Sequence, residues 1–387
     1  MHTRSHAGLT LFPTIRPGTF IRRPNRFLVE CGVNGIVTPA HLPNPGRLWE
    51  LLLPGARLYV SENHNKSGRK TRYTVVAVER DGEWVLLHTQ KSNAVVQWLL
   101  EHKKIPDLED AVIVKPEATV GHSRFDFLLE QSKKPFFLEV KSCTLFGTTI
   151  AMFPDAVTER GRRHLLELAT LAERGSKCGV MFLIHWPHAH YFLPDYHTDI
   201  AFARTFYELR NTLTFKAIAV KWERNLSPGS DIHEVAIPWE LIGREAQDSG
   251  SYILILHVPD EIRITIGKLG PVTFRKGYYL YVGSARTNLQ KRIERHLRKR
   301  KTFFWHIDYL RDRADRCTAL PIRTQTPLEH EIARTLGNIS DWQIPGFGCS
   351  DCSCTTHLFG MHNNPVENSQ FIDILLDFRI NRLEAYL

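Results

Sequence analysis

The sequence predicts a multidomain protein in which a small β-barrel precedes an α/β region and a further domain. Short apolar segments separated by turns fill residues 19–88, which is typical of a small barrel. Farther along, segments with helical apolar spacing alternate with strand-like runs, as in layered α/β folds. A polar, glycine-bounded stretch at 242–250 then indicates that a last domain begins near Ser249. A chain of 387 residues can hold two or three such domains.

The predicted elements follow one another in a simple order. Barrel strands are expected at 19–21, 26–33, 35–37, 57–61, 73–79 and 84–88. A helix is expected at 93–102, where Val95, Val96, Leu99 and Leu100 recur at helical spacing. The remaining elements are two strands through 124–129 and 136–141, a helix at 157–174, a strand at 179–184, a helix at 201–211 and a strand at 215–220.

Composition and charge narrow the class of protein. The chain has 50 Lys and Arg against 41 Asp and Glu, a net charge of +9, which favours a polyanionic partner. Residues 1–13 lack the apolar core of a signal peptide, and no run approaches the roughly 20 apolar residues that span a bilayer. The seven cysteines, an odd number, indicate reduced thiols. We therefore expect a cytoplasmic protein with no membrane partner.

Two adjacent predicted strands carry charged residues between apolar neighbours. Asp126 lies in the first strand, and Glu139 and Lys141 lie in the second. Because side chains alternate between the two faces of a strand, Glu139 and Lys141 share a face. The polar segment 130–135, which ends in proline, suits a hairpin connection. The hairpin would therefore present all three charged groups together.

This set of charged groups fits metal-assisted phosphodiester hydrolysis. Two carboxylates can hold a hard divalent cation, Mg²⁺ or Mn²⁺, and a nearby ammonium group can position water or contact a phosphate. The alternative is that the charged residues merely fringe a half-buried strand. Charges placed among Phe125, Phe127, Leu138 and Val140 are costly unless they are paired or metal-bound, which favours the functional interpretation.

Basic residues of the predicted barrel are candidates for phosphate contacts. Those in the first strands are Arg22, Arg23 and Arg26. Cations that follow a backbone, with aromatic rings to stack bases, suit single-strand binding. We nevertheless expect Phe27 to fill the core, with base contact as the alternative. The turn 43–46 is expected to be structural, although Arg47 beside it could contact phosphate.

The helix expected at 157–174 offers a second basic patch. Arg160, Arg163 and His164 lie three or four positions apart and could share one phosphate-facing side of the helix. Asp155 precedes the helix, where it could cap the N-terminus or approach the metal. Both interpretations of Asp155 stay open.

The first 240 residues contain four distinctive motifs: HLPNPGR at 41–47, SRFDF at 123–127, EVKSCTL at 139–145 and FPDAVTERG at 153–161. On these motifs the region resembles the sugar fermentation stimulation protein family. The resemblance implies an N-terminal OB-like barrel (1–88), a domain of the PD-(D/E)XK nuclease fold (89–242) and DNA binding. It also implies that Asp126, Glu139 and Lys141 form the nuclease core, with Glu117 as an additional acidic metal ligand.

The last 140 residues carry a second set of motifs: GSY at 250–252, YVGSA at 281–285, FWHIDY at 304–309 and LEHEIA at 328–333. On these the region 250–387, after a linker at 243–249, resembles the GIY-YIG endonuclease superfamily. The resemblance implies a catalytic core with one metal-binding glutamate, composed of Tyr252, Tyr281, Arg292, His296 and Glu329. Glu331 competes with Glu329 for the metal, and the tyrosines could instead be core residues. The long spacing between the tyrosines implies an extended hairpin around 267–271.

Two further segments of the last region have alternative interpretations. Residues 286–301 contain eight Lys or Arg and one Glu, which indicates either a solvated face or contact with DNA or RNA. The candidates for contact there are Lys291, Arg295 and Arg298. A thiol-rich run could supply zinc ligands through Cys349, Cys352, Cys354 and His357. Because its spacing is not the paired CxxC…CxxC pattern, a packed loop is the favoured interpretation.

The sequence thus predicts a DNA-binding, Mg²⁺-dependent endonuclease, with RNA as an alternative substrate. The competing hypothesis is a non-catalytic DNA-binding regulator of sugar-utilisation genes that retains nuclease folds. A sugar-pathway enzyme is a third hypothesis, and no motif such as GxxxxGK[ST] supports it. The sequence does not indicate an oligomeric state.

Overall fold

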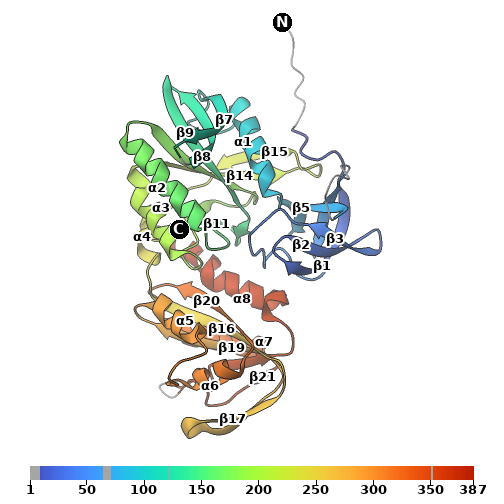
Figure 1. Cartoon of the computed structure of the whole chain (residues 1–387), viewed down its shortest axis with the longest axis vertical. Helices are drawn as coiled ribbons and strands as arrows, with labels where there is room; N and C mark the ends of the chain where they lie inside the picture. Colours follow the sequence, from blue (N-terminus) through green and yellow to red (C-terminus); the bar gives the residue numbers. More distant parts are fainter. Residues whose placement is uncertain (1–8, 64–70, 122, 350–351) are drawn as a thin grey trace. The chain divides into compact units, whose positions relative to one another are not determined.

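A computed structural model of the chain describes residues 9–63, 71–121, 123–349 and 352–387. The chain divides into two compact units (Figure 1). Unit 1 comprises the described parts of Met1–Asp195 together with Ala201–Trp239, and unit 2 comprises Tyr196–Ile200 and Glu240–Leu387. Within the described residues no helix is both long and apolar enough to cross a membrane.

Unit 1 begins with a closed, OB-like barrel. Its strands are β1 (Arg16–Asn25), β2 (Leu28–Val33), β3 (Ile36–His41), β4 (Arg57–Glu62), β5 (Tyr73–Arg80) and β6 (Glu83–Leu86). They pair in the order β3-β2-β1-β4-β5-β6, and an additional β3–β5 pairing closes the barrel. The turn between β2 and β3 is Asn34-Gly35, with both residues at positive φ as a two-residue hairpin turn requires. The barrel predicted from the sequence is confirmed.

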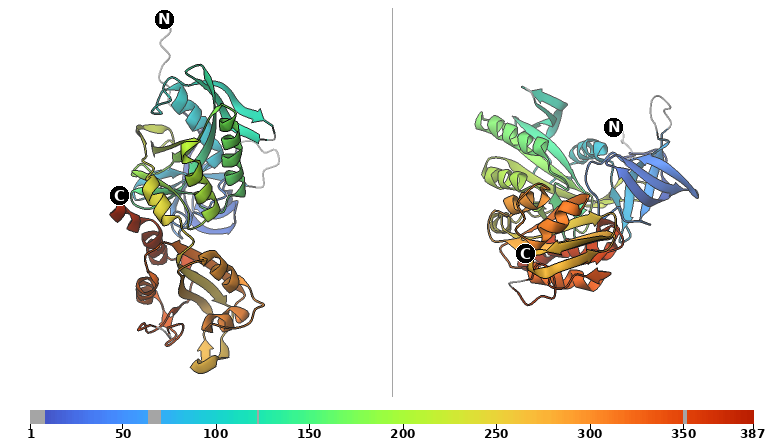
Figure 2. Two further views of the ribbon diagram at one scale, coloured as in Figure 1. Left: turned by 90° about the vertical axis from the view of Figure 1, so that its left-hand side faces the viewer. Right: turned by 60° about the horizontal axis from the view of Figure 1, so that its bottom comes forward.

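A mixed six-stranded sheet forms the second part of unit 1 and can be followed from cyan to yellow in Figure 2. Its order is β15 (Pro228–Glu234), β14 (Thr214–Trp222), β12 (Lys177–Ile184), β9 (Lys134–Cys143), β8 (Ser123–Gln131) and β7 (Val112–Val120). Strand β12 runs parallel to both of its neighbours. A smaller sheet is formed by β10 (Leu145–Phe146), β11 (Ile150–Phe153) and β13 (Tyr191–Pro194). The predicted α/β layering is therefore present.

Helices cover both faces of this sheet. Helix α1 (Ser92–Glu101) packs its apolar face into one core with Leu138, Val140 and the barrel residue Trp84. On the other face, the connecting helices are α2 (Glu159–Glu173) and α3 (Ile200–Glu208), and Phe182 of β12 contacts Phe206 of α3. Glu139 and Lys141 alternate with Leu138 and Val140 along β9, so they lie on the face opposite α1.

Unit 2 is built on a five-stranded antiparallel sheet. The order is β20 (Arg316–Arg323), β16 (Gly250–Val258), β19 (Gly277–Ala285), β22 (Leu358–Met361) and β21 (Trp342–Gln343). Its helices are α4 (Trp239–Glu245, which begins in unit 1), α5 (Leu289–Leu297), α6 (His306–Arg313), α7 (Glu329–Ile339) and α8 (Ser369–Arg379). Strands β17 (Ile262–Ile266) and β18 (Gly270–Phe274) form the extended hairpin that the tyrosine spacing implied.

Candidate functional site

The β8–β9 hairpin brings the first set of predicted residues together. Its turn is shorter than expected: only Ser132 and Lys133 lie between the strands, both at positive φ, and Pro135 already pairs with Glu130. This tight turn fixes the register so that the Val140 backbone N–H donates to Asp126 Oδ2 at 2.7 Å. Asp126 therefore lies against the strand that carries Glu139 and Lys141.

Glu139 is the most enclosed carboxylate of this site. Its Oε1 accepts hydrogen bonds from Lys141 Nζ and from His164 Nδ1 of α2, each at 2.6 Å. Its Oε2 is buried and has no hydrogen-bond partner among the described residues. Burial by itself would raise the pKa of Glu139, but the contacts with His164 and Lys141 outweigh it and lower the pKa. Glu139 is thus an ionised carboxylate with one oxygen available to a ligand.

Asp126 differs from Glu139 in its electrostatics. Its Oδ1 accepts from Asn93 Nδ2 of α1 at 2.7 Å. Burial, and then the charge of Glu139, raise the pKa of Asp126. A bound cation would relieve both effects, because it would interact with two carboxylates that otherwise repel each other. The donor set is two neighbouring carboxylates, of which Glu139 keeps a buried unpaired oxygen, and it fits a hard divalent cation.

His164 has a role that the sequence did not assign to it. Arg160 Nε donates to His164 Nε2 at 3.4 Å, so the proton of the ring is on Nδ1 and is donated to Glu139. The predicted phosphate patch is therefore divided: His164 is buried against Glu139, whereas Arg160 and Arg163 are exposed.

In unit 2 the residues implied by the GIY-YIG resemblance gather on one side of the sheet. Tyr252 of β16 and Tyr281 of β19 have ring centroids 6.4 Å apart. Tyr252 Oη lies 2.8 Å from His296 Nε2 of α5. Burial raises the pKa of Tyr252 well above 10 and lowers the pKa of His296, so the hydroxyl donates to a neutral imidazole. A Cβ atom at position 283 would collide with the Tyr252 hydroxyl, which explains the glycine there.

Glu329 and Arg292 occupy different surroundings in the same unit. Glu329, at the start of α7, accepts from the Ser284 hydroxyl, and its Oε1 lies 3.2 Å from His357 Nδ1. Burial tends to raise the pKa of Glu329, but the contacts with His357 and Ser284 lower it. Arg292 stacks over the Trp305 ring, with Cζ 4.6 Å from the centroid. Glu331, the competing metal ligand, has no described contact that joins it to this group.

Comparisons with known proteins match this architecture. The family models that match are the SfsA N-terminal OB domain at 21–87, the sugar fermentation stimulation protein RE domain at 90–225 and the domain of unknown function DUF123 at 251–379. A sugar fermentation stimulation protein homolog of Methanosphaera stadtmanae is 42% identical over 49% of this chain and 81% of its own length. The chain belongs to the sugar fermentation stimulation protein family.

Other members of the family cover a similar part of the chain. The homolog of Methanothermobacter thermautotrophicus is 39% identical over 48% of this chain and 77% of its own length. The solved structure of Pyrococcus furiosus SfsA in complex with Ca²⁺ is 31% identical, with a TM-score of 0.54 over 59% of this chain and 98% of that one. The GIY-YIG-like region is thus carried in addition to a nearly complete sugar fermentation stimulation protein.

Two motifs of the family pack against each other. Leu48 N–H donates to Asp155 Oδ2 at 2.7 Å, and Arg47 Nε donates to the Asp155 carbonyl at 2.8 Å. Thr158, not Asp155, caps α2 by accepting from Gly161 N–H. Arg23 donates to the carbonyls of residues 26, 44, 46 and 47. Arg47 therefore joins the barrel to the sheet domain, whereas Arg23 holds backbone carbonyls within the barrel region. These engagements do not support the phosphate contacts predicted for the two side chains.

Sequence reasoning missed Glu50, which lies in the same contact region. Its side chain is buried, and Oε1 has no hydrogen-bond partner among the described residues. Burial, followed by the charge of Asp155, raises the pKa of Glu50 to about 8. A signal was present in the sequence, because this acid lies between Trp49 and an apolar run at 51–53.

On the OB-like barrel, one aromatic residue that was expected in the core lies on the surface. Phe20 is buried, as predicted, but Phe27 is 48% exposed, which corrects its expected place in the core. It follows the exposed Arg26, and its ring lies 6.5 Å from that of His41. Arg22 is exposed and forms a bidentate pair with Glu30, with both distances 2.7 Å. The barrel therefore presents an aromatic ring and a cation at one end of β1–β2.

Of the remaining residues predicted to bind metal or nucleic acid, one supports the fold through its contacts and the others are exposed. Glu117 is exposed on β7 and lies 3.6 Å from Arg124, and no described contact joins it to Asp126 or Glu139. In unit 2, Arg295 stacks over Trp305 and donates twice to the buried Asp308, so its side chain supports the fold. Lys291 and Arg298 are exposed on or beside α5. Among the contacts predicted on and beside α5, this exposed pair keeps the exposure expected of phosphate contacts.

Proposed function

We propose that unit 1 is a divalent-metal-dependent phosphodiesterase that acts on nucleic acid. Asp126 and Glu139 are the proposed metal ligands, and Lys141 is the proposed water-positioning group. The observation that carries the proposal is the buried, unpaired Oε2 of an ionised Glu139 beside Asp126 and Lys141. An unpaired buried carboxylate oxygen is costly to maintain, and a ligand that pairs with it supplies a physical reason for its presence.

The choice of metal follows from the donor set. Both ligands are carboxylates, which favour hard cations such as Mg²⁺, Mn²⁺ and Ca²⁺. The related Pyrococcus furiosus protein has been solved in complex with Ca²⁺, which supports a hard-cation site in this family. Such a cation, when bound, would polarise a phosphoryl oxygen and lower the pKa of a water molecule.

The protein side chains have separate parts in this proposal. Asn93 and the Val140 N–H hold Asp126 in one orientation. His164, supported by Arg160, holds Glu139 by one oxygen and leaves the other for the ion. The Lys141 ammonium group remains beside Glu139, where it can orient the attacking water and stabilise charge that develops on the phosphate.

The proposed substrate is DNA, with RNA as the alternative polyanion. The excess of basic residues over the whole chain favours association with phosphates. On the barrel, Arg26 can contact the backbone while the exposed Phe27 ring stacks on a base, an arrangement that tolerates any sequence. Arg160 and Arg163 are exposed on α2, whose His164 contacts Glu139.

The test is a cleavage assay on the full chain. Labelled single- and double-stranded DNA and RNA are incubated with and without Mg²⁺ or Mn²⁺, and Asp126→Asn and Glu139→Gln are compared with the unchanged protein. We expect metal-dependent cleavage that both substitutions strongly reduce while binding persists. Binding without cleavage under every condition would contradict the enzyme and favour the non-catalytic DNA-binding regulator.

We also propose a second phosphodiesterase centre in unit 2. The observation that favours it is the hydrogen bond between the buried Tyr252 hydroxyl and a neutral His296, which forms a path for a proton. Glu329 would supply the single carboxylate for a metal, and Arg292 would neutralise phosphate charge. Tyr252→Phe should remove the cleavage that remains in Glu139→Gln. Unchanged residual cleavage in this double variant would reject the second centre.

A further inference from the structure

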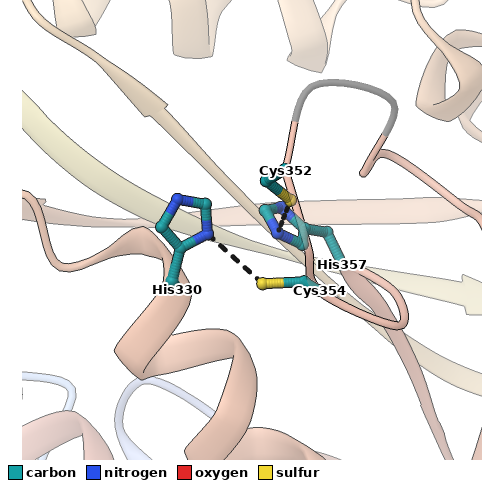
Figure 3. Close-up of side chains that lie close together, drawn as sticks. All are labelled: His330, Cys352, Cys354 and His357. Atoms are coloured by element: carbon teal, nitrogen blue, oxygen red, sulfur yellow. Dashed lines mark hydrogen bonds between the residues drawn. The ribbon is translucent and has the colours of Figure 1, made fainter.

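Four sulfur and nitrogen donors converge in unit 2, outside both proposed catalytic centres. His330 is the second residue of α7, and Cys352, Cys354 and His357 belong to the loop that leads into β22. Figure 3 shows the histidine on its helix facing the three loop side chains. The donor atoms of all four residues lie within 4.8 Å of one another. His330 therefore meets three residues that follow it by 22, 24 and 27 positions in the sequence.

Two of the sulfur–nitrogen distances match those within a tetrahedral metal site. Cys354 Sγ lies 3.3 Å from His330 Nδ1, and Cys352 Sγ lies 3.5 Å from His357 Nε2. With metal–sulfur bonds of about 2.3 Å and metal–nitrogen bonds of about 2.0–2.1 Å, a tetrahedron places sulfur and nitrogen about 3.5 Å apart. The two pairs thus already have the separation that a shared ion would impose.

The second nitrogen of His357 is also placed as in a metal site. His357 is buried, with 2% of its surface exposed, and its Nδ1 lies 3.2 Å from Glu329 Oε1. A metal-bound histidine usually presents its other ring nitrogen to a carboxylate or carbonyl, which fixes the ring orientation. His330 is exposed and the two cysteines are partly exposed, so an ion could reach the donors from solvent.

Cys349, the fourth ligand considered from the sequence, lies outside this group of donors. Its thiol instead faces the Thr355 carbonyl, with Sγ and O 3.6 Å apart. His330 takes the fourth position, and the sequence pattern gave no indication of this because it lies on a different element. Two thiolates and two imidazoles form the donor set of many structural zinc sites.

We propose that His330, Cys352, Cys354 and His357 bind one Zn²⁺ ion in a closed, four-coordinate structural site. The ion would join the loop before β22 to the first turn of α7. Because His357 also contacts Glu329, and Glu329 accepts from Ser284 of β19, the same ion would hold the Glu329 carboxylate in place. His330 and the two cysteines are thus positioning residues for Glu329 rather than catalytic residues.

The test uses metal binding as its readout and needs no cleavage activity. The full chain is purified under reducing conditions, its metal is removed with a chelator, and Co²⁺ is added, followed by displacement with Zn²⁺. Bound cobalt gives a thiolate-to-metal charge-transfer absorption that a carboxylate site such as Asp126 and Glu139 cannot produce. We expect this band, and about one zinc per chain by elemental analysis after reconstitution.

Four single variants then identify the ligands. Cys352→Ser, Cys354→Ser and His330→Gln should each lose the band and most of the zinc, whereas the matched control Cys349→Ser should keep both. Zinc removal should also lower the melting temperature of the unchanged protein and of Cys349→Ser alike. The titration of the unchanged, folded protein remains decisive if a variant fails to fold.

Three outcomes would overturn the proposal. The first is a protein that shows no thiolate–cobalt band. The second is a Cys352–Cys354 disulfide that persists in the protein purified under reducing conditions, detected by thiol counting. The third is loss of metal in Cys349→Ser together with retention in His330→Gln, which would replace the proposed ligand set.

Discussion

Glu139 in unit 1 is buried and Glu329 in unit 2 is partly buried; each carboxylate contacts a histidine, and their surroundings lead to different chemistry. Glu139 lies beside a second carboxylate, Asp126, and an ammonium group, and it keeps one oxygen unpaired. Glu329 has no described second carboxylate partner; its neighbours are a serine hydroxyl and His357. The first arrangement favours a hard cation shared by two acids, and the second favours a single acid held by its histidine.

The comparison shows how the neighbours of a carboxylate, more than its burial, decide its role. Both pKa values are lowered although burial opposes this. The other ring nitrogen of each histidine also has a different neighbour. In unit 1, His164 Nε2 contacts the cation Arg160, whereas in unit 2, His357 Nε2 contacts the thiol of Cys352.

The largest expected effect is on cleavage by unit 1. Lys141→Met removes the ammonium group beside Glu139 and should reduce the cleavage rate by about 10²–10⁴-fold, with little change in DNA affinity. Lys134→Met, an exposed position on the same strand, is the matched control and should stay near the unchanged rate. Equal losses in both variants would mean that Lys141 contributes only general charge.

A second prediction concerns the stability of unit 2. Asp308 is buried and accepts from Arg295, while Lys301 Nζ lies 2.9 Å from its Oδ1. Asp308→Asn should destabilise the domain by about 3 kcal/mol, because two cations lose a buried partner. Burial would raise the pKa of Asp308, but contacts with His296, Arg295 and Lys301 lower it well below its usual value.

The Asp308 carboxyl also makes the stability of unit 2 depend on pH. Because the folded pKa is depressed, the stabilisation from Asp308 is present above the unfolded pKa near 3.8 and is lost as the pH falls through the folded value. Denaturant unfolding between pH 2 and pH 6 measures it. Asp308→Asn should unfold with a smaller loss of stability over that interval, and an unchanged loss would contradict the assignment.

Glu50 in unit 1 predicts the opposite pH response. Its folded pKa is raised to about 8, so between its ordinary value of 4.5 and about 8 the unfolded chain ionises first and stability falls as the pH rises. Glu50→Gln should remove this fall and stabilise the protein at pH 8 by about 2 kcal/mol. Glu173→Gln, an exposed position on α2, is the control. Thermal melts of the unchanged protein and both variants at pH 5 and pH 8 measure the effect. A fall in stability in Glu50→Gln equal to that of the unchanged protein would contradict the prediction.

The smallest expected effect concerns the barrel surface. Phe27→Ala removes the exposed ring proposed to stack on a base and should weaken single-strand binding by about 1 kcal/mol, roughly fivefold. Ile36→Ala, another exposed apolar residue, should leave binding unchanged. Fluorescence anisotropy with labelled single strands measures both, and equal affinities in the two variants would exclude the stacking role.

The sequence by itself determined the barrel, the β8–β9 hairpin and the set Asp126, Glu139 and Lys141. These features depend on residues close together in the chain, where strand alternation and a short turn leave few arrangements. The family resemblance also indicated the Tyr252–His296 group, because each of its motifs opens or ends a local element.

Only the tertiary structure decided which distant groups complete each site. It joined His164 to Glu139, placed Arg23 against carbonyls of the barrel region and Arg47 against Asp155, exposed Phe27, and substituted His330 for Cys349 in the thiol cluster. The physical reason is that such contacts depend on how helices and strands far apart in the chain pack together. The spacing of residues in the sequence predicts which side chains are neighbours within one helix or strand, but not which side chains meet between separate elements.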